Sequence, residues 1–584
     1  MRSCSEANGR EQFDIYTPIL RIPTDLKTKM LVRGTEIPYR KTKPLFVSLS
    51  DIDCLCYLIA RHSSGRFDRI LSHTVDVVTS VVVKDSTGIT NLAYLMASNN
   101  CPSAGTIDSG DTAFVIFSAA LVFIQTPAVG FFYGGMVRRK NMLNTIFLSF
   151  AAAGVVMVQW ALFGYSISFG NHNAGIGNWA WGGLKDVSAY DSNPDYAPTI
   201  PHLVYSNFQM MFAAITPALI SGAVVERVNT ITWLIFVFLW TSLVYDPLAH
   251  WVWAGGSQYG ADGSCEYVVG WLRNLGAIDF AGGTVIHISS GIAALAFSLV
   301  IGKRHEYNFS KPHQPASIPF TVLGTTLLWF GWVGFNGGSA LSAGPLAALA
   351  AMNTTIAAAS GFLTWLIINL AEEKGMRASF LGALIGVVVG LVAITPASGY
   401  SILFGVVPAF PSYILLKFKH RLPFDDSLDV FFCHGVGGIV GSLMTGLFAT
   451  QEVNPAANNG AFYGNGRQFA IQLLAVVVTV GFSGIGTAVL ALFLKYTIGL
   501  KVSSEAQMDG MDKYCHGEEA TNDNEMFDRL STKFRELIRE ETNRISTRSS
   551  VSSMSDADEQ TDVEMDQIPP PHPSPYTAVE RDEA

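Results

Sequence analysis

The sequence contains few charged residues for its length, and this shortage indicates its broad class. Only 15% of the 584 residues are charged, whereas 49% are hydrophobic and the mean hydropathy is +0.31. A soluble globular protein carries about 25% charged residues, so the composition argues against a chain of several soluble domains. The basic residues form no cluster of the kind that binds nucleic acid. The composition instead indicates one large membrane domain between two polar ends.

Cysteine is also scarce, and its spacing does not suggest a metal site. The seven cysteines stand at positions 4, 54, 56, 101, 265, 433 and 515. Cys54 and Cys56 are too close together for a zinc knuckle, and no second pair completes a site. Cys101 and Cys265 both lie on the side of the membrane that we assign to the outside. A disulfide between them is therefore possible, but the sequence does not decide it.

A membrane metalloenzyme that uses His250, His287 and His434 is one class to consider. No His-x-x-x-His pair occurs on one predicted helix, and no carboxylate has the spacing that would complete a catalytic zinc site. We therefore expect no metal, no cofactor and no enzymatic activity.

The remaining polar sequence lies at the two ends. Residues 1–111 are an N-terminal extension, which we expect to be extracellular or poorly ordered. The first thirty residues lack the apolar core of a signal peptide, so the first membrane helix is expected to direct insertion. Residues 112–500 form the membrane domain, and residues 501–584 form a cytosolic regulatory tail that is largely disordered after 546.

Eleven apolar segments lie between residues 113 and 495. Each is about long enough to cross roughly 30 Å of hydrocarbon as a helix. Glycine is frequent within them, as it is in tightly packed membrane bundles. The predicted fold class is therefore an all-α polytopic membrane protein with eleven transmembrane helices.

Lysine and arginine in the loops predict the orientation of the domain. With the N-terminus outside, the outer loops hold three basic residues, Lys185, Arg273 and Arg467. The inner loops then hold twelve: Arg138, Arg139, Lys140, Arg227, Lys303, Arg304, Lys311, Lys374, Arg377, Lys417, Lys419 and Arg421. We therefore predict an extracellular N-terminus and a cytosolic C-terminus.

Two histidines stand alone inside long apolar runs. His287 lies in the segment AGGTVIHISSG, and His434 lies in FFCHGVGGIVG. A titratable side chain in lipid is costly and marks a functional site, and the small residues around both let neighbouring helices approach closely. If the two imidazoles meet, they form a polar line through an otherwise hydrophobic wall.

Four segments then carry a resemblance to a known family: 279–287 (DFAGGTVIH), 331–339 (GWVGFNGGS), 394–400 (ITPASGY) and 429–441 (DVFFCHGVGGIVG). They resemble the ammonium transporter, methylammonium permease and Rhesus family over about residues 110–520. The match is better to the ammonium transporter branch than to the Rhesus branch, and favours a fungal-type methylammonium permease. The resemblance implies eleven helices in two inverted, pseudo-symmetric halves. It also implies a homotrimer with one pore per subunit, in the plasma membrane.

The resemblance further implies an outer cation site and a gate. Trp253, Phe208 and Ser339 match the residues that hold ammonium at the outer mouth. An aromatic face attracts a small cation, and a hydroxyl oxygen accepts hydrogen bonds from ammonium. Phe212 and Phe335 match the stacked pair that closes the path below this site. Taken alone, Trp253 and Phe208 are equally typical of the aromatic belt at a membrane interface.

Three further residues complete the implied path. His287 and His434 match twin histidines that share a hydrogen bond in the pore and offer a donor and an acceptor along it. Asp279 begins the helix that carries His287, and we expect it to cap that helix and support the outer site rather than bind the cation. Asp246 is unexplained: it either reaches the headgroups or adds negative potential near Trp253.

The function implied is transport of ammonium or methylammonium across the lipid bilayer. The cation is recruited outside, loses its proton, and crosses as ammonia with the proton following. A neutral gas channel of the Rhesus type fits less well, since a gas needs no cation site around Trp253. An ammonium sensor is the alternative function, because some fungal relatives are credited with signalling.

The tail bears on that alternative. It has a serine-rich stretch, Ser546–Ser555, that a kinase could modify, and apolar residues at helical spacing that predict an amphipathic helix. These apolar residues are Phe527, Leu530, Phe534, Leu537, Ile538 and Ile545. A solvated, partly helical tail is the other interpretation of the same residues.

Overall fold

The structure, a computed structural model, describes residues 105–171, 173–259, 265–305, 314–396 and 399–520, together with 31–32, 35–36, 533, 536–537 and 539. The chain divides into two compact units. The described part of the first, Met1–Asn100 with Ala261–Ser264, is the antiparallel strand pair β1 (Leu31–Val32) and β2 (Thr35–Glu36). Most of the predicted N-terminal extension therefore lies outside the described residues. All that follows concerns the second unit.

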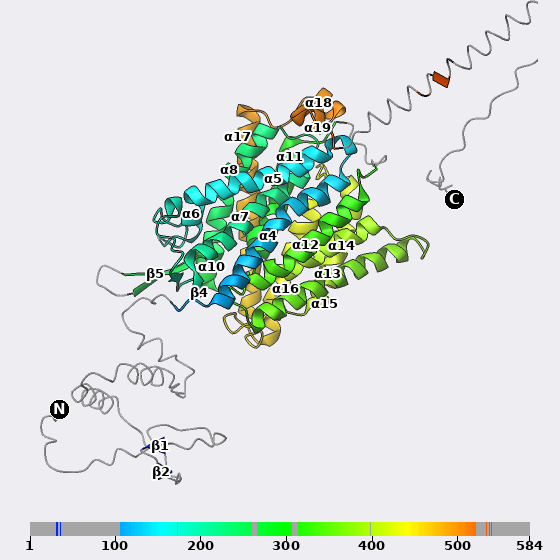
Figure 1. The fold of residues 1–584 in the computed structure, drawn as a ribbon. Coiled ribbons are helices and arrows are strands. Elements are labelled where there is room, and N and C mark those ends of the chain that lie inside the picture. Colours follow the sequence, from blue (N-terminus) through cyan, green and yellow to red (C-terminus); the bar gives the residue numbers. More distant parts are fainter. Residues whose placement is uncertain are drawn as a thin grey trace, which may run out of the picture. The chain divides into compact units, whose positions relative to one another are not determined.

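The second unit is a bundle of long apolar helices, many of them side by side (Figure 1). In chain order they are α4 (Ser109–Met136), α5 (Met142–Gln159), α6 (Tyr165–Phe169), α7 (His202–Val224), α8 (Thr230–Trp240), α9 (Asp246–Trp253), α11 (Ser289–Ile301), α12 (Ile318–Gly338), α13 (Pro345–Glu372), α14 (Phe380–Ile394), α15 (Ser401–Lys417), α16 (Gly437–Phe448) and α17 (Gly466–Thr497). Short 3-10 turns stand between them: η2 (Arg139–Asn141), η4 (Gly182–Leu184), η7 (Lys419–Arg421) and η9 (Ala461–Tyr463).

Nine helical segments of the described part are at least 18 residues long and apolar enough to cross a membrane. This confirms the predicted all-α membrane fold. Helices α14 and α15 are shorter, at 15 and 17 residues, and would span only about 22–26 Å as α-helices. The count of eleven spans therefore stays a prediction.

Four of the spans contain a π-helical segment, which no apolar periodicity predicted. These are η3 (Trp160–Gly164), η5 (Thr241–Tyr245), η6 (Gly283–Ile288) and η8 (Phe431–Val436). η3 continues α5 into α6, and η5 continues α8 into α9, whereas η6 and η8 open the spans that end in α11 and α16. Wide turns of this kind are frequent at functional sites.

Polar side chains at the start of several helices explain where these begin. Asn229 accepts hydrogen bonds from the backbone of Ile231 and Thr232 at the start of α8, and Ser379 accepts one from Gly382 at the start of α14. Each side chain satisfies backbone N–H groups that have no partner within the helix. Such caps fix the ends of helices whose sides are too uniformly apolar to do so.

Glycine determines how closely the histidine-bearing spans approach. A Cβ atom at Gly291, one turn after His287, would lie 2.1 Å from the backbone nitrogen of Gly435, which follows His434. A side chain at Gly291 would therefore push the two backbones apart. Gly386 of α14 behaves in the same way, since its Cβ would lie 2.6 Å from the carbonyl oxygen of Gly361 in α13.

Asp246, which the sequence left unexplained, faces the interior of the bundle and not the headgroups. The residue is 0% exposed. Its carboxylate accepts hydrogen bonds from Gln159 Nε2 at 2.6 Å and from Ser168 Oγ at 3.2 Å. Asp246 begins α9, Gln159 ends α5 and Ser168 lies in α6. These bonds therefore tie the start of α9 to the span that contains α5 and α6. An ionisable group at this depth is tolerated only with such partners.

One end of the bundle carries two small antiparallel sheets. They are β3 (Ser192–Asn193) with β4 (Ala197–Pro201), and β5 (Gly255–Tyr259) with β6 (Cys265–Val269), followed by the short helix α10 (Trp271–Leu275). Cys265 is disulfide-bonded, and its partner lies outside the described residues. Its pairing with Cys101 therefore stays a prediction.

Ion pairs hold the loops at the opposite end together. Arg304 donates to Glu226 at 2.6 Å and to Asp425 at 2.9 Å, and Arg138 donates to Glu226 at 3.2 Å. Burial alone would raise the pKa of Glu226, but Arg304 and Arg138 lower it from 4.5 to about 2. The carboxylate is therefore ionised and its charge is balanced by the two guanidinium groups.

The first part of the tail docks at this same end. Helices α18 (Ser504–Asp509) and α19 (Met511–His516) lie there, opposite β4, β5 and α10 (Figure 1). The Asp512 carboxylate accepts hydrogen bonds from the backbone nitrogens of Leu143 and Asn144, in the first turn of α5. Of the six apolar residues in the predicted amphipathic helix, the structure describes only Leu537, which is exposed.

Candidate functional site

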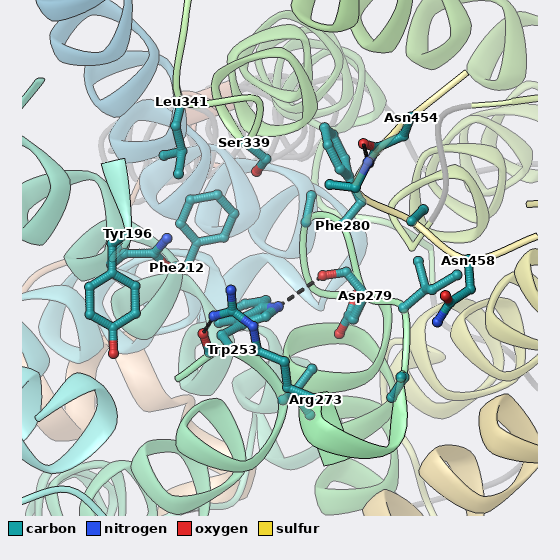
Figure 2. Close-up of a pocket in the computed structure, with 18 of the residues that line it drawn as sticks. Tyr196, Phe212, Trp253, Arg273, Asp279, Phe280, Ser339, Leu341, Asn454 and Asn458 are labelled. Atoms are coloured by element: carbon teal, nitrogen blue, oxygen red, sulfur yellow. Dashed lines mark hydrogen bonds between the residues drawn. The ribbon is translucent and has the colours of Figure 1, made fainter. Parts of the chain in front are cut away.

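The end with the small sheets contains a vestibule of about 410 Å³. Trp253, Ser339, Phe212 and Asp279, all predicted site residues, line it, and so does Arg273 (Figure 2). Trp253 comes from α9, Ser339 from the end of α12 and Phe212 from α7. Asp279 precedes η6, and Arg273 lies on α10. Residues that are far apart in the sequence therefore meet around one cavity at the end of the bundle.

Trp253 is the last residue of α9 and is held on both sides. Its indole Nε1 donates to the carbonyl oxygen of Asp279 at 2.9 Å, and its own carbonyl accepts a hydrogen bond from Arg273 Nη1 (Figure 2). Ser339 also lines the vestibule, and its hydroxyl donates to the carbonyl of Phe335 at 2.8 Å. Because that bond uses the hydroxyl proton, the Ser339 oxygen presents its lone pairs as acceptors.

Asp279 caps the span that carries His287. Its carboxylate accepts backbone N–H bonds from the four residues 282–285 at 2.6–3.1 Å, and a hydroxyl bond from Thr284. Gly282 permits this tight turn because its φ of 113° lies in the left-handed region. All of these partners belong to the protein, so Asp279 supports the wall of the vestibule through its backbone carbonyl and holds Trp253.

Two phenyl rings lie below the vestibule. The rings of Phe212 and Phe335 have centroids 4.5 Å apart, and their planes are inclined by 57°. Phe212 also contacts the edge of Trp253 at 6.3 Å. Both phenylalanines are almost fully buried, at 2% and 0% exposed. The structure thus brings together the two rings that the sequence analysis paired, directly beneath Trp253.

Phe208 lies elsewhere than the sequence analysis placed it. It was expected to line the outer site beside Trp253, but it is 0% exposed and is not among the vestibule's lining residues. Its ring packs behind that of Phe212, with centroids 4.8 Å apart. Phe208 and Phe212 are four residues apart on α7 and so share one helix face, which explains why the sequence could not tell which of them reaches the cavity.

His287 and His434 meet deeper in the bundle. Their Nδ1 atoms are 3.2 Å apart, and the rings are 1% and 4% exposed as residues. A hydrogen bond between two ring nitrogens needs one donor and one acceptor, so at least one of the rings is neutral. His287 Nε2 is buried and has no hydrogen-bond partner in the part of the chain that the structure describes. A buried nitrogen of this kind is available to a polar molecule that passes.

Trp332 was not assigned a role from the sequence, although it belongs to a quoted motif. Its ring stacks on His287 at 5.2 Å and contacts Phe335 at 5.3 Å, while its Nε1 donates to Thr395 Oγ1 at 2.9 Å. It precedes Phe335 by three residues on α12, and this spacing places both side chains on one face. That spacing is the signal that could have identified it.

The third histidine of the metalloenzyme alternative does not join the other two. His250 lies with its Nδ1 3.1 Å from the carbonyl oxygen of Ser168 and its Nε2 2.7 Å from that of Asn173. Among the described residues no group of three or more His, Cys, Asp or Glu side chains is arranged to hold a metal ion. His250 instead ties α9 to α6 and to the loop that follows it.

The arrangement from Trp253 to His434 is continuous. Indole, phenyl pair and imidazole pair follow one another through contacts of 6.3, 4.5 and 6.0 Å between ring centroids. A vestibule at the end of an apolar helical bundle, together with buried ionisable groups inside the bundle, is typical of polytopic membrane transporters.

The chain belongs to the ammonium transporter family. The model of the Ammonium Transporter Family matches residues 113–521. The chain is similar to the ammonium transporter of Bacillus subtilis strain 168, with 43% identity over 420 residues that cover 71% of this chain and 99% of that protein.

The chain is also similar to solved structures of other proteins. The crystal structure of Candida albicans Mep2 has 36% sequence identity and a TM-score of 0.62, and the match covers 68% of this chain and 88% of that one. A structure described as a sensor Amt protein has 29% identity and a TM-score of 0.61, with 69% and 97% of the two chains covered.

Proposed function

We propose that the protein transports ammonium and methylammonium, and that the path runs from the vestibule past Phe212 and Phe335 to the histidine pair. The observation that carries this proposal is the unbroken series of rings from Trp253 to His287. Membership of the ammonium transporter family supports the substrate, since the relative from Bacillus subtilis is named an ammonium transporter.

The vestibule recruits the cation. The indole of Trp253 and the ring of Phe212 attract a small cation through their π faces, and the Ser339 oxygen accepts one of its N–H bonds. Phe208 supports Phe212 from behind and takes no direct part. Ammonium has four N–H donors in a tetrahedral arrangement, and potassium has none, so the acceptor separates two ions of similar size.

Ammonium gives its proton to water in the vestibule before ammonia passes the phenyl rings, and the proton then follows separately to the histidine pair. A full charge in a narrow apolar passage is costly, whereas neutral ammonia crosses such a passage readily. The histidine pair then accepts ammonia's hydrogen bonds and offers a relay for the separated proton, because imidazole donates at one nitrogen and accepts at the other.

Removal of one imidazole tests the path. We expect His434→Ala to reduce methylammonium uptake at least tenfold while the protein still reaches the membrane, because His287 loses its partner at 3.2 Å. Cys433→Ala is the matched control, since Cys433 is the preceding residue on the same π-helical segment, is 4% exposed, and is assigned no part in the path. Normal ammonium-dependent currents in His434→Ala would contradict the proposal.

We further propose that the protein is a multi-pass protein of the plasma membrane, with the vestibule outside and the tail in the cytosol. The disulfide at Cys265 supports this, because disulfides persist on the oxidising side of a membrane. In a variant that lacks Cys4, Cys54 and Cys56, which also lie on the predicted outer side, a membrane-impermeant thiol reagent should label Tyr267→Cys in intact cells. Tyr267 is 59% exposed on β6. Labelling only after lysis would reverse the orientation.

A homotrimer with one pore per subunit is part of the same proposal. Large apolar side chains are exposed on α13 and α15, such as Ile367 at 63% and Ile402 at 61%, and they need either lipid or another subunit as a neighbour. Mass measurement of the detergent-solubilised protein by light scattering distinguishes a trimer from a monomer.

An ammonium sensor is the second candidate, and the similarity to a protein described as a sensor Amt protein favours it. A kinase acting on Ser546–Ser555 would supply a regulatory input. Met511 and Asp512 are buried against the bundle, and this contact decides where the tail should be truncated to test a sensor role. Truncation after residue 520 keeps this contact, whereas truncation after Lys501 removes it. Signalling that is lost while uptake persists in the longer truncation would support a sensor role.

A further inference from the structure

Arg273 places a positive charge in the vestibule that is proposed to collect cations. It lies on α10, and its guanidinium lines the same space as Trp253 and Ser339 (Figure 2). Among the described residues that line the vestibule, Arg273 is the one basic side chain. A fixed positive charge there works against cation binding by Coulomb repulsion, so its presence needs an explanation.

The guanidinium is held in place from two sides. Its Nη1 donates to the carbonyl oxygen of Trp253, and the backbone of Gly255 lies against it. A Cβ atom at Gly255 would be only 2.7 Å from Nη1 and 2.9 Å from Cζ. A side chain at Gly255 would displace the guanidinium, and glycine therefore keeps the space that Arg273 occupies. Arg273 is an exposed residue, and these two contacts hold its charge beside Trp253.

The two acidic side chains in the vestibule are each engaged by other groups. Asp195 accepts hydrogen bonds from the backbone nitrogen and the hydroxyl of Ser257, at 2.9 and 2.8 Å. Asp279 accepts the N–H groups at the start of the next span. Without Arg273 the vestibule would have a formal charge of −2 from these carboxylates, a value that favours divalent cations with oxygen ligands. With it, the formal charge is −1.

We infer that Arg273 sets the selectivity of the vestibule for monovalent over divalent cations. This inference rests on the proposed function. The free energy of a cation in the potential of a fixed charge is proportional to the cation's own charge. A unit charge several ångströms away across water changes the local concentration of a monovalent ion by about threefold. The same charge changes that of a divalent ion by the square, about ninefold. Arg273 thus sacrifices a little affinity for ammonium and excludes divalent competitors more strongly.

Three variants test this inference in the full-length protein. Arg273→Gln and Arg273→Met remove the charge, whereas Arg273→Lys keeps it. In the two neutral variants we expect the half-saturation concentration for methylammonium to fall about threefold, and the inhibition constant of Ba²⁺ to fall about ninefold. Arg273→Lys should resemble the wild type in both values. Raising the ionic strength should reduce the differences, because salt screens exposed charges.

The outcomes separate this inference from the proposed function. If the wild type shows no saturable uptake of methylammonium, the proposed function fails and the inference fails with it. If the wild type transports but the neutral variants keep wild-type values, only the inference is overturned. A purely positioning role for Arg273 would impair all three variants and shift the values for methylammonium and Ba²⁺ by the same factor, which also overturns it.

Discussion

Replacing Asp279 with asparagine tests whether this residue supports the vestibule or binds the cation directly. The carboxylate accepts five hydrogen bonds: four from backbone N–H groups and one from the Thr284 hydroxyl. An amide group keeps one acceptor oxygen and turns an NH₂ group toward the remaining donors. At least two donors would lose their acceptor, and a hydrogen bond to a charged group contributes about 1.5–3 kcal/mol. We therefore expect Asp279→Asn to destabilise the protein by roughly 3–6 kcal/mol.

The same change should reach the transport path through Trp253. The carbonyl of Asp279 holds the indole at 2.9 Å, so a disordered turn would release the ring. We expect a lower unfolding temperature of the detergent-solubilised protein and at least tenfold lower methylammonium uptake per molecule at the cell surface. Asp279→Glu, which keeps the charge and both oxygens, should be intermediate. Lost uptake at an unchanged unfolding temperature would refute the supporting role and indicate direct contact with the cation.

Two further predictions concern the paired rings of Phe212 and Phe335 and the ion pairs of Glu226. Phe212→Ala removes one of the two rings that are 4.5 Å apart, so currents carried by sodium or potassium should appear in the variant. Phe208→Leu, which changes a ring packed against Phe212, should not produce these currents. A Phe212→Ala variant without sodium or potassium currents would contradict the role of the phenyl pair as a gate. The pKa of Glu226 is lowered from 4.5 to about 2, so its ionised form contributes about 3 kcal/mol at neutral pH. This stability is present above pH 4.5 and is lost as the pH falls from 4.5 toward 2. When the unfolding temperature is measured between pH 4.5 and pH 2, Glu226→Gln should remove that pH dependence. An unchanged pH dependence in the variant would show that Glu226 does not cause it.

The sequence predicted the fold class because lipid imposes a simple requirement. A helix that crosses a membrane must be apolar over most of its length, and it satisfies its own backbone hydrogen bonds. The long segments around α4, α7 and α17 therefore stand out in the sequence without knowledge of their neighbours. The four π-helical segments do not stand out, because an extra residue in one turn barely changes the pattern of a helix that is apolar on all sides.

The site was predicted in part, and the limits have physical causes. His287 and His434 are conspicuous because ionisable side chains are rare inside apolar runs, whereas Trp253 was identified only through the resemblance to a known family. The sequence assigned Phe208 to the outer site and Phe212 to the gate, but both lie on the face of α7 that turns inward, and only the packing decides which ring borders the cavity. Arg273 carried no signal beyond its charge in a loop, because its position depends on the fold of β5 and α10.

The wide turns η6 and η8 make the meeting of His287 and His434 sensitive to chain length. Each histidine stands in a stretch that winds with i→i+5 bonds, so each span holds a surplus residue compared with an α-helix of the same rise. Deleting that residue would leave the hydrophobic length almost unchanged but rotate the remainder of the helix by about 100°. The small faces at Gly291 and Gly435 would then no longer oppose each other. A deletion within η6 or η8 is therefore expected to disturb the pairing of His287 with His434, although both histidines remain in the sequence.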